Sequence, residues 1–228
     1  FSDSKKTKIL TVDSISSDSL TESENIELRN YLKVIAKERL SIGAIVMNCN
    51  PFTLGHRYLI EYAASQCDKL YIFVVEEDKS FFPFKDRFDL VVKGTSDIKN
   101  VTVLPSGKFI ISQRTFAAYS NKANLQEQVI DPSMDVNIFA RSIAPALGIN
   151  IRFAGEEPLD NITRQYNDTM RRILPMHNIQ FIVIKRKESE GTVISASRVR
   201  ALLKDKRFSE IKKLVPATTM KYLLDKFN

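Results

Sequence analysis

Short apolar runs alternate with amphipathic helical segments along most of this chain, and this alternation restricts the folds that it can adopt. Strands that are apolar on both faces and joined by helices are typical of a parallel sheet covered on both sides. The pattern therefore predicts an α/β domain with an open, doubly wound, Rossmann-like sheet of five parallel strands. The expected strands are 42–48, 70–75, 101–104, 151–154 and 179–184, with helices at 55–65, 83–92, 135–147 and 161–174.

The two ends of the chain are expected to add a linker and further helices. Residues 1–20 are rich in Ser, Asp and Lys and suggest a tail, with a short edge strand at 9–12. The sequence TESE at 21–24 resembles a capping box that opens a helix. We therefore divide the chain into a linker and helix at 1–40 and a main domain at 41–228. C-terminal helices are expected at about 196–205, 208–214 and 216–227, while residues 106–134 show no clear pattern.

Composition and charge limit the kinds of partner. The chain has 228 residues, 43% of them hydrophobic, so one domain of ordinary size with a large core is expected. The net charge is +7, and the whole excess lies in residues 152–228, which hold 16 basic and 9 acidic side chains; the other 18 basic and 18 acidic ones balance. Such a surplus suits nucleic acid, an acidic protein or a polyanionic small molecule, and is also compatible with a solvated basic face.

Cysteine content and hydropathy indicate a soluble cytoplasmic protein. Cys49 and Cys67 are too few for a disulfide framework, and each lies in or beside an expected core element. Neither has the sequence neighbours of a metal ligand. No apolar run approaches the roughly 18 to 20 residues that span a bilayer, and the first residues have no apolar signal core. We therefore expect no membrane partner.

The segment NPFTLGH at 50–56 follows the first expected strand and opens the next expected helix. An α/β fold binds its ligand at the carboxyl ends of its strands, and a helix start offers N–H groups and partial positive charge to an anion. Gly55 lets the backbone approach a bulky anion, while Thr53 and His56 add side-chain donors. An imidazole beside a triphosphate is expected to be protonated or to act as a donor, and it can stabilise charge on the α-phosphate and the leaving pyrophosphate.

Two other interpretations of NPFTLGH stay open from the sequence. The segment could be an ordinary helix start with a capping histidine, because short matches of this kind also arise by chance. A third role for His56, as the base of a catalytic triad, is poorly supported, because the other histidine is His177 and the chain has no nucleophile elbow. The position between a strand and a helix favours the phosphate site.

The segment ISASRVR at 194–200 opens another expected helix. Ser195 and Ser197 stand at the helix start, and Arg200 falls one turn later, close to the face of Ser197. Hydroxyls and helix N–H groups can cradle β- and γ-phosphates, and a guanidinium can neutralise them with a bidentate fork. Alone, the segment is equally compatible with a serine N-cap and a solvated arginine. Its pairing with NPFTLGH favours a site for a nucleoside triphosphate.

Residues 45–56 and 194–200 resemble the two signature motifs of the HIGH-type nucleotidyltransferase superfamily, which includes pantetheine-phosphate and nicotinamide-nucleotide adenylyltransferases. Within it, the chain resembles most the nucleotidyltransferase domain of the citrate lyase ligase family. This resemblance covers nearly all of residues 41–227. It includes the segments 73–79, 84–90, 109–116, 155–158 and 214–217, with Thr163, Tyr166 and Asn167.

The resemblance implies a reaction and a set of site residues. ATP and acetate would give acetyl-adenylate and pyrophosphate, and the acetyl group would pass to the prosthetic-group thiol of the citrate lyase acyl carrier subunit. Carried over to this sequence, the catalytic residues would be Thr53, His56 and Arg200. The ATP-binding residues would be Asn50, Gly55, His56, Gly155, Glu156, Ser195, Ser197 and Arg200.

Two further contacts and a cation complete the expected site. Lys85 and Arg87, in the second strand-to-helix connection, are candidate anion contacts, or equally solvated residues in the first turns of a helix. Mg²⁺ is expected to accompany the triphosphate, so no dedicated protein metal site is expected.

The sequence departs from the family pattern in two places. Met47 stands nine residues before His56, where many superfamily members have Gly, so the approach of the nucleotide to the first strand is expected to differ in detail. Members of the ligase family usually also carry an N-terminal acetyltransferase-like domain, for which residues 1–40 are too short. Either these residues are the remnant of such a domain in a fragment, or the adenylating domain stands alone.

Two other functions remain as alternatives. An adenylyltransferase that joins AMP to a phosphorylated small molecule, such as pantetheine phosphate, would share both motifs. A non-catalytic nucleotide- or nucleic-acid-binding module would use the basic C-terminal third. The sequence has no RNA-stacking aromatic motif, however, so no nucleic-acid partner is expected.

Overall fold

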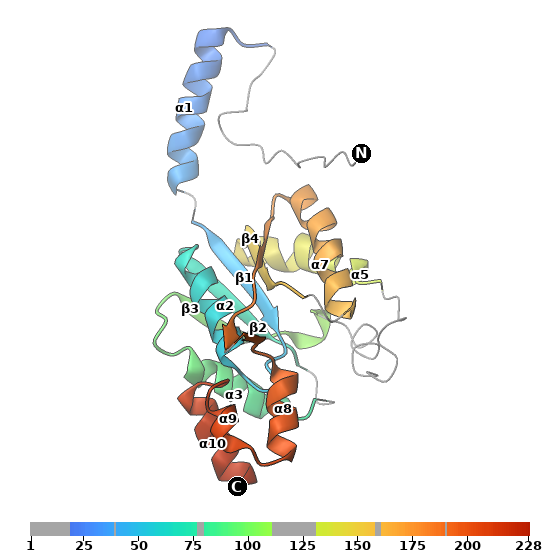
Figure 1. Ribbon diagram of the computed structural model, residues 1–228. Coiled ribbons are helices and arrows are strands. Elements are labelled where there is room, and N and C mark those ends of the chain that lie inside the picture. The colour runs from blue at the N-terminus through green and yellow to red at the C-terminus, as the bar shows by residue number, and fades with distance from the viewer. Residues whose placement is uncertain (1–18, 39, 77–79, 111–130, 158–160, 190) are drawn as a thin grey trace. The chain divides into compact units, whose positions relative to one another are not determined.

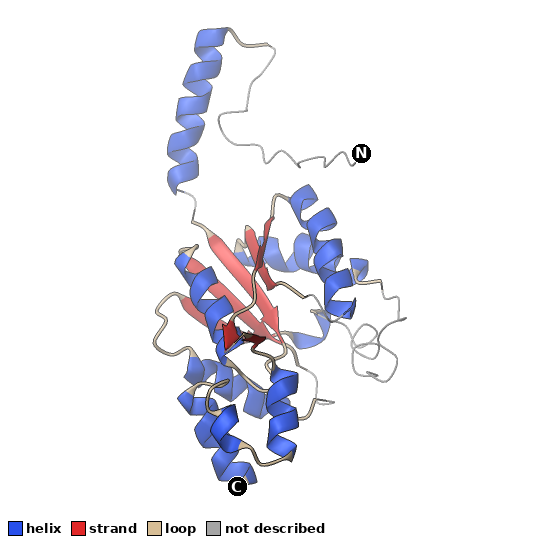
Figure 2. Ribbon diagram, in the orientation of Figure 1, coloured by secondary structure: helices blue, strands red, loops and turns tan. Residues whose placement is uncertain are grey.

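Five parallel strands form the sheet of this computed structural model, in the order β3-β2-β1-β4-β5 (Figure 2). The structure describes residues 19–38, 40–76, 80–110, 131–157, 161–189 and 191–228. From β1 the chain runs outward through β2 to β3, and it then returns to the other side of β1 to add β4 and β5. The five-stranded, doubly wound sheet predicted from the sequence is thus confirmed. The strands are β1 (Ile42–Met47), β2 (Lys69–Val74), β3 (Val101–Pro105), β4 (Ile151–Gly155) and β5 (Gln180–Ile184).

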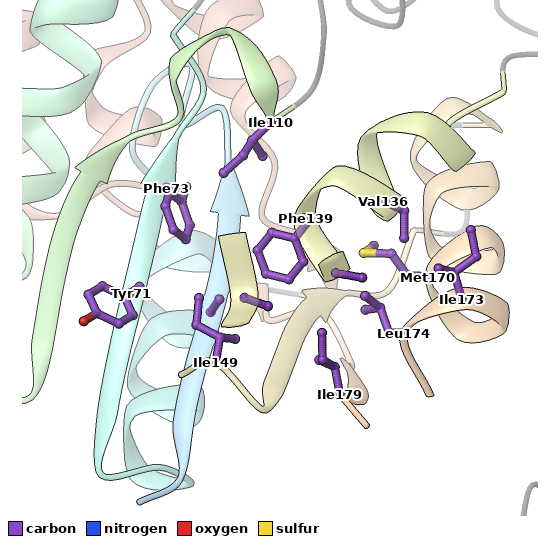
Figure 3. Packing of buried hydrophobic residues seen from close by; sticks show 13 residues of the cluster. Tyr71, Phe73, Ile110, Val136, Phe139, Ile149, Met170, Ile173, Leu174 and Ile179 are labelled. Carbon is purple, nitrogen blue, oxygen red and sulfur yellow. The ribbon is translucent and has the colours of Figure 1, made fainter. Parts of the chain in front are cut away.

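Helices cover both faces of this sheet (Figure 1). Side chains that alternate along β1 divide between two apolar clusters, because successive residues of a strand point to opposite faces. Ile45 packs on the face covered by α2 (Leu54–Ser65) and α3 (Phe84–Gly94). Ala44 packs on the other face, which is covered by several helical segments (Figure 3). These are α5 (Ser133–Ile138), η4 (Phe139–Ile143), α6 (Ala144–Leu147), α7 (Asn161–Ile173) and η5 (Leu174–His177).

The helix expected at 135–147 begins two residues earlier, at Ser133, and changes its hydrogen-bonding pattern on the way. It is α-helical in α5, has a π-helical turn at Phe139–Ile143, and becomes α-helical again in α6. Pro145 accounts for the interruption, because it has no N–H to continue the regular ladder. The helix ends at Gly148, whose φ of 68° is a left-handed conformation that glycine adopts without strain.

The C-terminal region forms the expected helices and one element that the sequence did not predict. Three helices pack around a third apolar cluster. A short antiparallel hairpin of β6 (Glu188–Ser189) and β7 (Thr192–Val193) precedes them. Strands of two residues carry too little periodicity to be detected in a sequence. The helices are α8 (Ala196–Lys204), α9 (Phe208–Ile211) and α10 (Ala217–Phe227). Elsewhere in the domain, a 3-10 turn, η2 (Gly107–Phe109), follows β3.

Residues Phe1–Leu40 form a unit separate from Ser41–Asn228. In the described part of this unit, α1 (Glu22–Glu38) starts with the predicted capping box. The Glu24 carboxylate accepts a hydrogen bond from the Thr21 amide at 2.8 Å, and the Glu24 amide donates to the Thr21 hydroxyl at 3.3 Å. The edge strand expected at 9–12 lies outside the described residues.

The end of α3 packs against the turn that carries NPFTLGH. Phe52 is fully buried, and its ring lies directly over Gly94, where a Cβ atom would come within 2.4 Å of Phe52 Cε1. The carbonyl of Gly94 also accepts a hydrogen bond from Arg57 Nη1 at 2.6 Å. Only glycine fits at this contact, which fixes the turn after β1 against the second helix of the domain.

Gly94→Ala should therefore destabilise the domain. Overpacking of a core typically costs 1–3 kcal/mol, which exceeds the roughly 1 kcal/mol that alanine gains over glycine inside a helix. We expect a net loss of up to about 2 kcal/mol in the free energy of unfolding, measured by urea denaturation. As a control, Gly155→Ala should change stability little, because no atom of the described residues lies within 4 Å of the added Cβ. Equal losses in both variants would contradict this account of Gly94.

Candidate functional site

The first helix start is held by reciprocal hydrogen bonds between Thr53 and His56. Thr53 is the N-cap of α2, and its hydroxyl accepts from the His56 amide at 3.4 Å. In return His56 Nδ1 accepts from the Thr53 amide at 3.1 Å and lies 2.9 Å from the Thr53 hydroxyl. A capping box normally uses Glu or Gln at the position of His56. The imidazole thus caps the helix, and the cap in turn fixes the orientation of the ring.

These bonds also define the protonation of His56. A backbone amide can only donate, so Nδ1 is unprotonated and the ring proton is on Nε2. Burial, together with the positive charge of Arg186, lowers the pKa of His56 to about 4. Of the two states expected from the sequence, the described structure favours a neutral imidazole that donates through Nε2.

The second helix start has the same form. Ser195 is the N-cap of α8, and its hydroxyl accepts from the Arg198 amide at 3.2 Å. The hydroxyl of Ser197 lies 3.1 Å from that of Ser195. Two hydroxyls and the N-terminal amides of a nine-residue helix are therefore gathered at one point, an arrangement that suits an anion.

The two helix starts are in direct contact. Arg200 Nη1 donates a hydrogen bond to the carbonyl oxygen of Asn50, which joins α8 to the turn after β1. A Cβ atom on Gly55 would lie 3.1 Å from the carbonyl oxygen of Ile194. The absence of a side chain at Gly55 thus lets the second segment approach the first. This is a second reason for glycine at this position, besides the approach of an anion expected from the sequence.

Both helix starts line one cavity of about 1090 Å³ at the carboxyl ends of β1 and β4. This is the point at which the strand order reverses, where open α/β sheets bind their ligands. The structure therefore brings together most of the residues expected from the sequence. Those that line the cavity are Asn50, Thr53, Gly55, His56, Gly155, Ser195, Ser197 and Arg200.

Glu156 does not line this cavity. Its side chain is exposed, and its backbone forms two hydrogen bonds. The amide donates to Ile184 O at 2.8 Å, and the carbonyl accepts from Arg186 Nε at 2.7 Å. The next residue, Glu157, lines the cavity instead and forms an ion pair with Arg186. Side chains alternate in an extended segment, so the acidic residue on the cavity side is one position later than expected.

Arg87 requires a correction, because it has a structural role. It is fully buried, and its guanidinium donates to the carbonyl oxygens of Phe82, Asn48 and Val75 at 3.0, 2.8 and 2.8 Å. These carbonyls belong to the connections that leave the sheet, so Arg87 supports the turns rather than facing the cavity. Lys85 does not line the cavity either.

Basic residues after β5 form a wall of the cavity that sequence reasoning missed. Lys185, Arg186 and Lys187 follow the strand directly, and all three line the cavity. The ammonium group of Lys187 lies 5.7 Å from the centre of the Tyr58 ring. Three consecutive cations at the carboxyl end of an expected strand were a signal that could have revealed this wall. A further cation, Arg152 of β4, lines the cavity from a buried position.

Comparison with known families assigns the domain. A family model described as the citrate lyase ligase C-terminal domain matches residues 42–223. The chain belongs to this family. The match includes both helix starts and all five strands of the sheet.

Curated relatives agree with this membership of the citrate lyase ligase family, and one solved structure shares the fold. The citrate (pro-3S)-lyase ligase of Escherichia coli K12 is 45% identical over 215 residues, which cover 90% of this chain and 60% of that protein. The corresponding ligase of Klebsiella pneumoniae is 41% identical and covers the same share of this chain and 62% of its own length. The chain thus spans about 60% of the length of these relatives. Thermotoga maritima TmcAL, solved with alpha-thio ATP, shares the fold with a TM-score of 0.50 at 15% identity, over 82% of this chain and 55% of that one.

No helix in the described ranges is long and apolar enough to cross a membrane. The described residues also contain no group of three or more His, Cys, Asp or Glu side chains that could hold a metal ion.

The free energy of unfolding should fall as the pH is lowered from 7 to 5. In the unfolded chain, histidine binds a proton near pH 6.5, whereas folded His56 stays neutral down to about pH 4. Between these values the unfolded state binds more protons, so stability decreases with falling pH, by about 1–2 kcal/mol for this group. Urea denaturation at the two pH values measures the difference.

His56→Asn should reduce this pH dependence, because asparagine can accept the Thr53 amide proton but does not titrate. His177→Asn, which replaces the other histidine, should behave like the unmodified protein. If His56→Asn kept the full pH difference, His56 would not be the group held neutral by the fold.

Proposed function

We propose that this chain carries the adenylating site of a citrate lyase ligase. In the first step an oxygen of acetate attacks the α-phosphorus of ATP, the bond from that phosphorus to the bridging oxygen breaks, and pyrophosphate leaves with the electron pair. In the second step a thiolate on the prosthetic group of the citrate lyase acyl carrier subunit attacks the acetyl carbonyl, and AMP leaves. The cavity supports the adenylation step, and transfer to the thiol completes the reaction of the whole protein.

The observation that carries this proposal is the meeting of two helix starts at one cavity. The N-termini of α2 and α8 both present amides and hydroxyls there, and Arg200 joins them. The cations that follow β5 extend the positive wall. Such an arrangement matches a triphosphate, which needs donors at several phosphates together with compensating charge. Membership of the ligase family supports acetate as the acyl substrate.

His56 has the geometry of an electrostatic catalyst. Its ring is oriented by the Thr53 cap, and its proton is on Nε2, so it can donate to oxygens on which negative charge grows during the reaction. It needs no proton transfer to do this. The helix starts and Arg200 position the nucleotide for in-line attack, and such positioning contributes much of the catalysis in phosphoryl transfers.

Magnesium fits this scheme as a companion of the nucleotide. The described residues offer hydroxyls, amides and cations at the helix starts rather than a carboxylate cluster, so a divalent ion would be held through triphosphate oxygens. It would supply positive charge to the phosphates. The free thiols of Cys49 and Cys67 suit a reducing cytoplasm, where we place the reaction.

Exchange of labelled pyrophosphate into ATP, measured across a panel of carboxylates, tests the proposal. We expect exchange that depends on acetate. His56→Asn preserves an acceptor for the helix cap but removes the Nε2 donor, so it should reduce the exchange rate roughly 10²- to 10³-fold. His177→Asn is the matched control and should exchange normally. Near-normal exchange by His56→Asn would remove this donor from the mechanism.

The same assay separates the alternative functions. Exchange with a phosphorylated substrate such as pantetheine phosphate, but not with acetate, would indicate an adenylyltransferase. A protein that exchanges with neither and binds RNA or DNA with a steep salt dependence would be a binding module.

A further inference from the structure

Arg152 is a buried cation on an interior strand of the sheet. It lies on β4 in register with Ala44 of β1 and Phe181 of β5, three positions before the strand ends at Gly155. Its exposed fraction is 7%. Nevertheless it lines the same cavity as the two helix starts, at a greater depth along the strand.

The guanidinium of Arg152 has donors without acceptors. Its Nε and Nη1 atoms are buried, and neither makes a hydrogen bond within the described part of the chain. No described carboxylate forms an ion pair with it. Burial lowers the pKa of Arg152 to about 9, so the group keeps its charge at neutral pH. An unpaired buried charge is destabilising, and its presence beside a cavity indicates a missing anionic partner.

An aromatic ring lies beside this cation, and aliphatic side chains form part of the cavity wall. The guanidinium carbon lies 4.8 Å from the centre of the Phe139 ring, which covers one side of the group. Val136, Met170 and Leu174 also line the cavity (Figure 3). The deep end of the cavity therefore combines one cation with a hydrocarbon surface, in contrast to the hydroxyls and several cations at the helix starts.

A polar pair that includes Asp135, one helical turn before Phe139, is already satisfied within the protein. The Tyr166 hydroxyl donates to the carboxylate of Asp135 at 2.6 Å, and both residues line the cavity. No described carboxylate, Asp135 included, contributes to the pKa shift of Arg152, so the pair leaves the cation available to a ligand.

We propose that Arg152 binds the carboxylate of the acyl substrate, while the apolar walls receive its alkyl group. This inference rests on the proposed adenylation function, for which it supplies the binding site of the nucleophile. A guanidinium can hold a carboxylate with two parallel N–H donors. Binding by one cation among apolar walls selects a short monocarboxylate such as acetate and excludes dicarboxylates such as malonate, whose second charge would be buried without a partner.

The test is the acetate dependence of pyrophosphate exchange in Arg152→Met. This change preserves side-chain length and removes the charge. We expect the KM for acetate to rise at least about tenfold, the equivalent of about 1.4 kcal/mol, while the KM for ATP stays within about twofold. Arg152→Lys keeps the charge but loses the fork, so its KM for acetate should lie between the two. Arg171→Met, which changes an exposed arginine of α7 outside the cavity, is the matched control.

A binding measurement distinguishes failure of this inference from failure of the proposed function. Sodium acetate should raise the melting temperature of the unmodified protein above that in sodium chloride of equal ionic strength, and should not do so for Arg152→Met. Without acetate, Arg152→Met should be at least as stable as the unmodified protein, because it removes an unpaired buried charge. An unchanged KM for acetate, or an equal acetate shift in both proteins, overturns the role of Arg152. Absence of exchange with every carboxylate, despite an acetate shift that depends on Arg152, overturns only the adenylation.

Discussion

The hydrogen bond from the Arg200 guanidinium to the carbonyl of Asn50 joins segments that are 150 residues apart in the sequence. The side chain of Asn50 extends the connection, because its oxygen accepts from the Phe82 amide at 3.0 Å. The turns after β1 and β2 and the start of α8 are thus tied to one residue. The geometry of the cavity depends on this link, since each helix start alone would present only part of an anion site.

Two buried arginines differ in whether the protein supplies acceptors for the guanidinium group. Arg87 has acceptors for its guanidinium in the carbonyls of three loop residues, which compensates for the loss of hydration. Arg152 lies beside an aromatic ring, and its Nε and Nη1 find no acceptor in the described structure. The first arginine stabilises the turns that hold the cavity. The second arginine places an unpaired positive charge in the cavity for a ligand, which lowers the stability of the domain.

The sequence predicted the framework better than the details of the site. Strand number and both helix starts followed from periodicity and from turn chemistry, because these are local properties, and parallel pairing followed from the alternation of strands with helices. The burial of Arg87 did not, since only the fold reveals that three carbonyls converge on its side chain. Glu157, rather than the predicted Glu156, lines the cavity because successive side chains alternate in the extended segment after β4. The sequence could not locate the end of this strand to within one residue. Arg152 was hidden for a different reason: a cation within an apolar strand shows its significance only once its neighbours are known.

The reciprocal cap at Thr53 and His56 has a consequence for variation at position 56. The ring meets two separate demands: Nδ1 accepts a hydrogen bond at the helix start, and the side chain lines the cavity, where the proposed function requires a donor. A carboxamide in its place offers both kinds of atom but at a different reach, and a carboxylate offers only acceptors. Few side chains can therefore supply both the acceptor and the donor. Substitution of His56 is restricted by its role in the helix cap as much as by its role in catalysis. A variant at position 56 that fails to fold would not by itself distinguish these two roles.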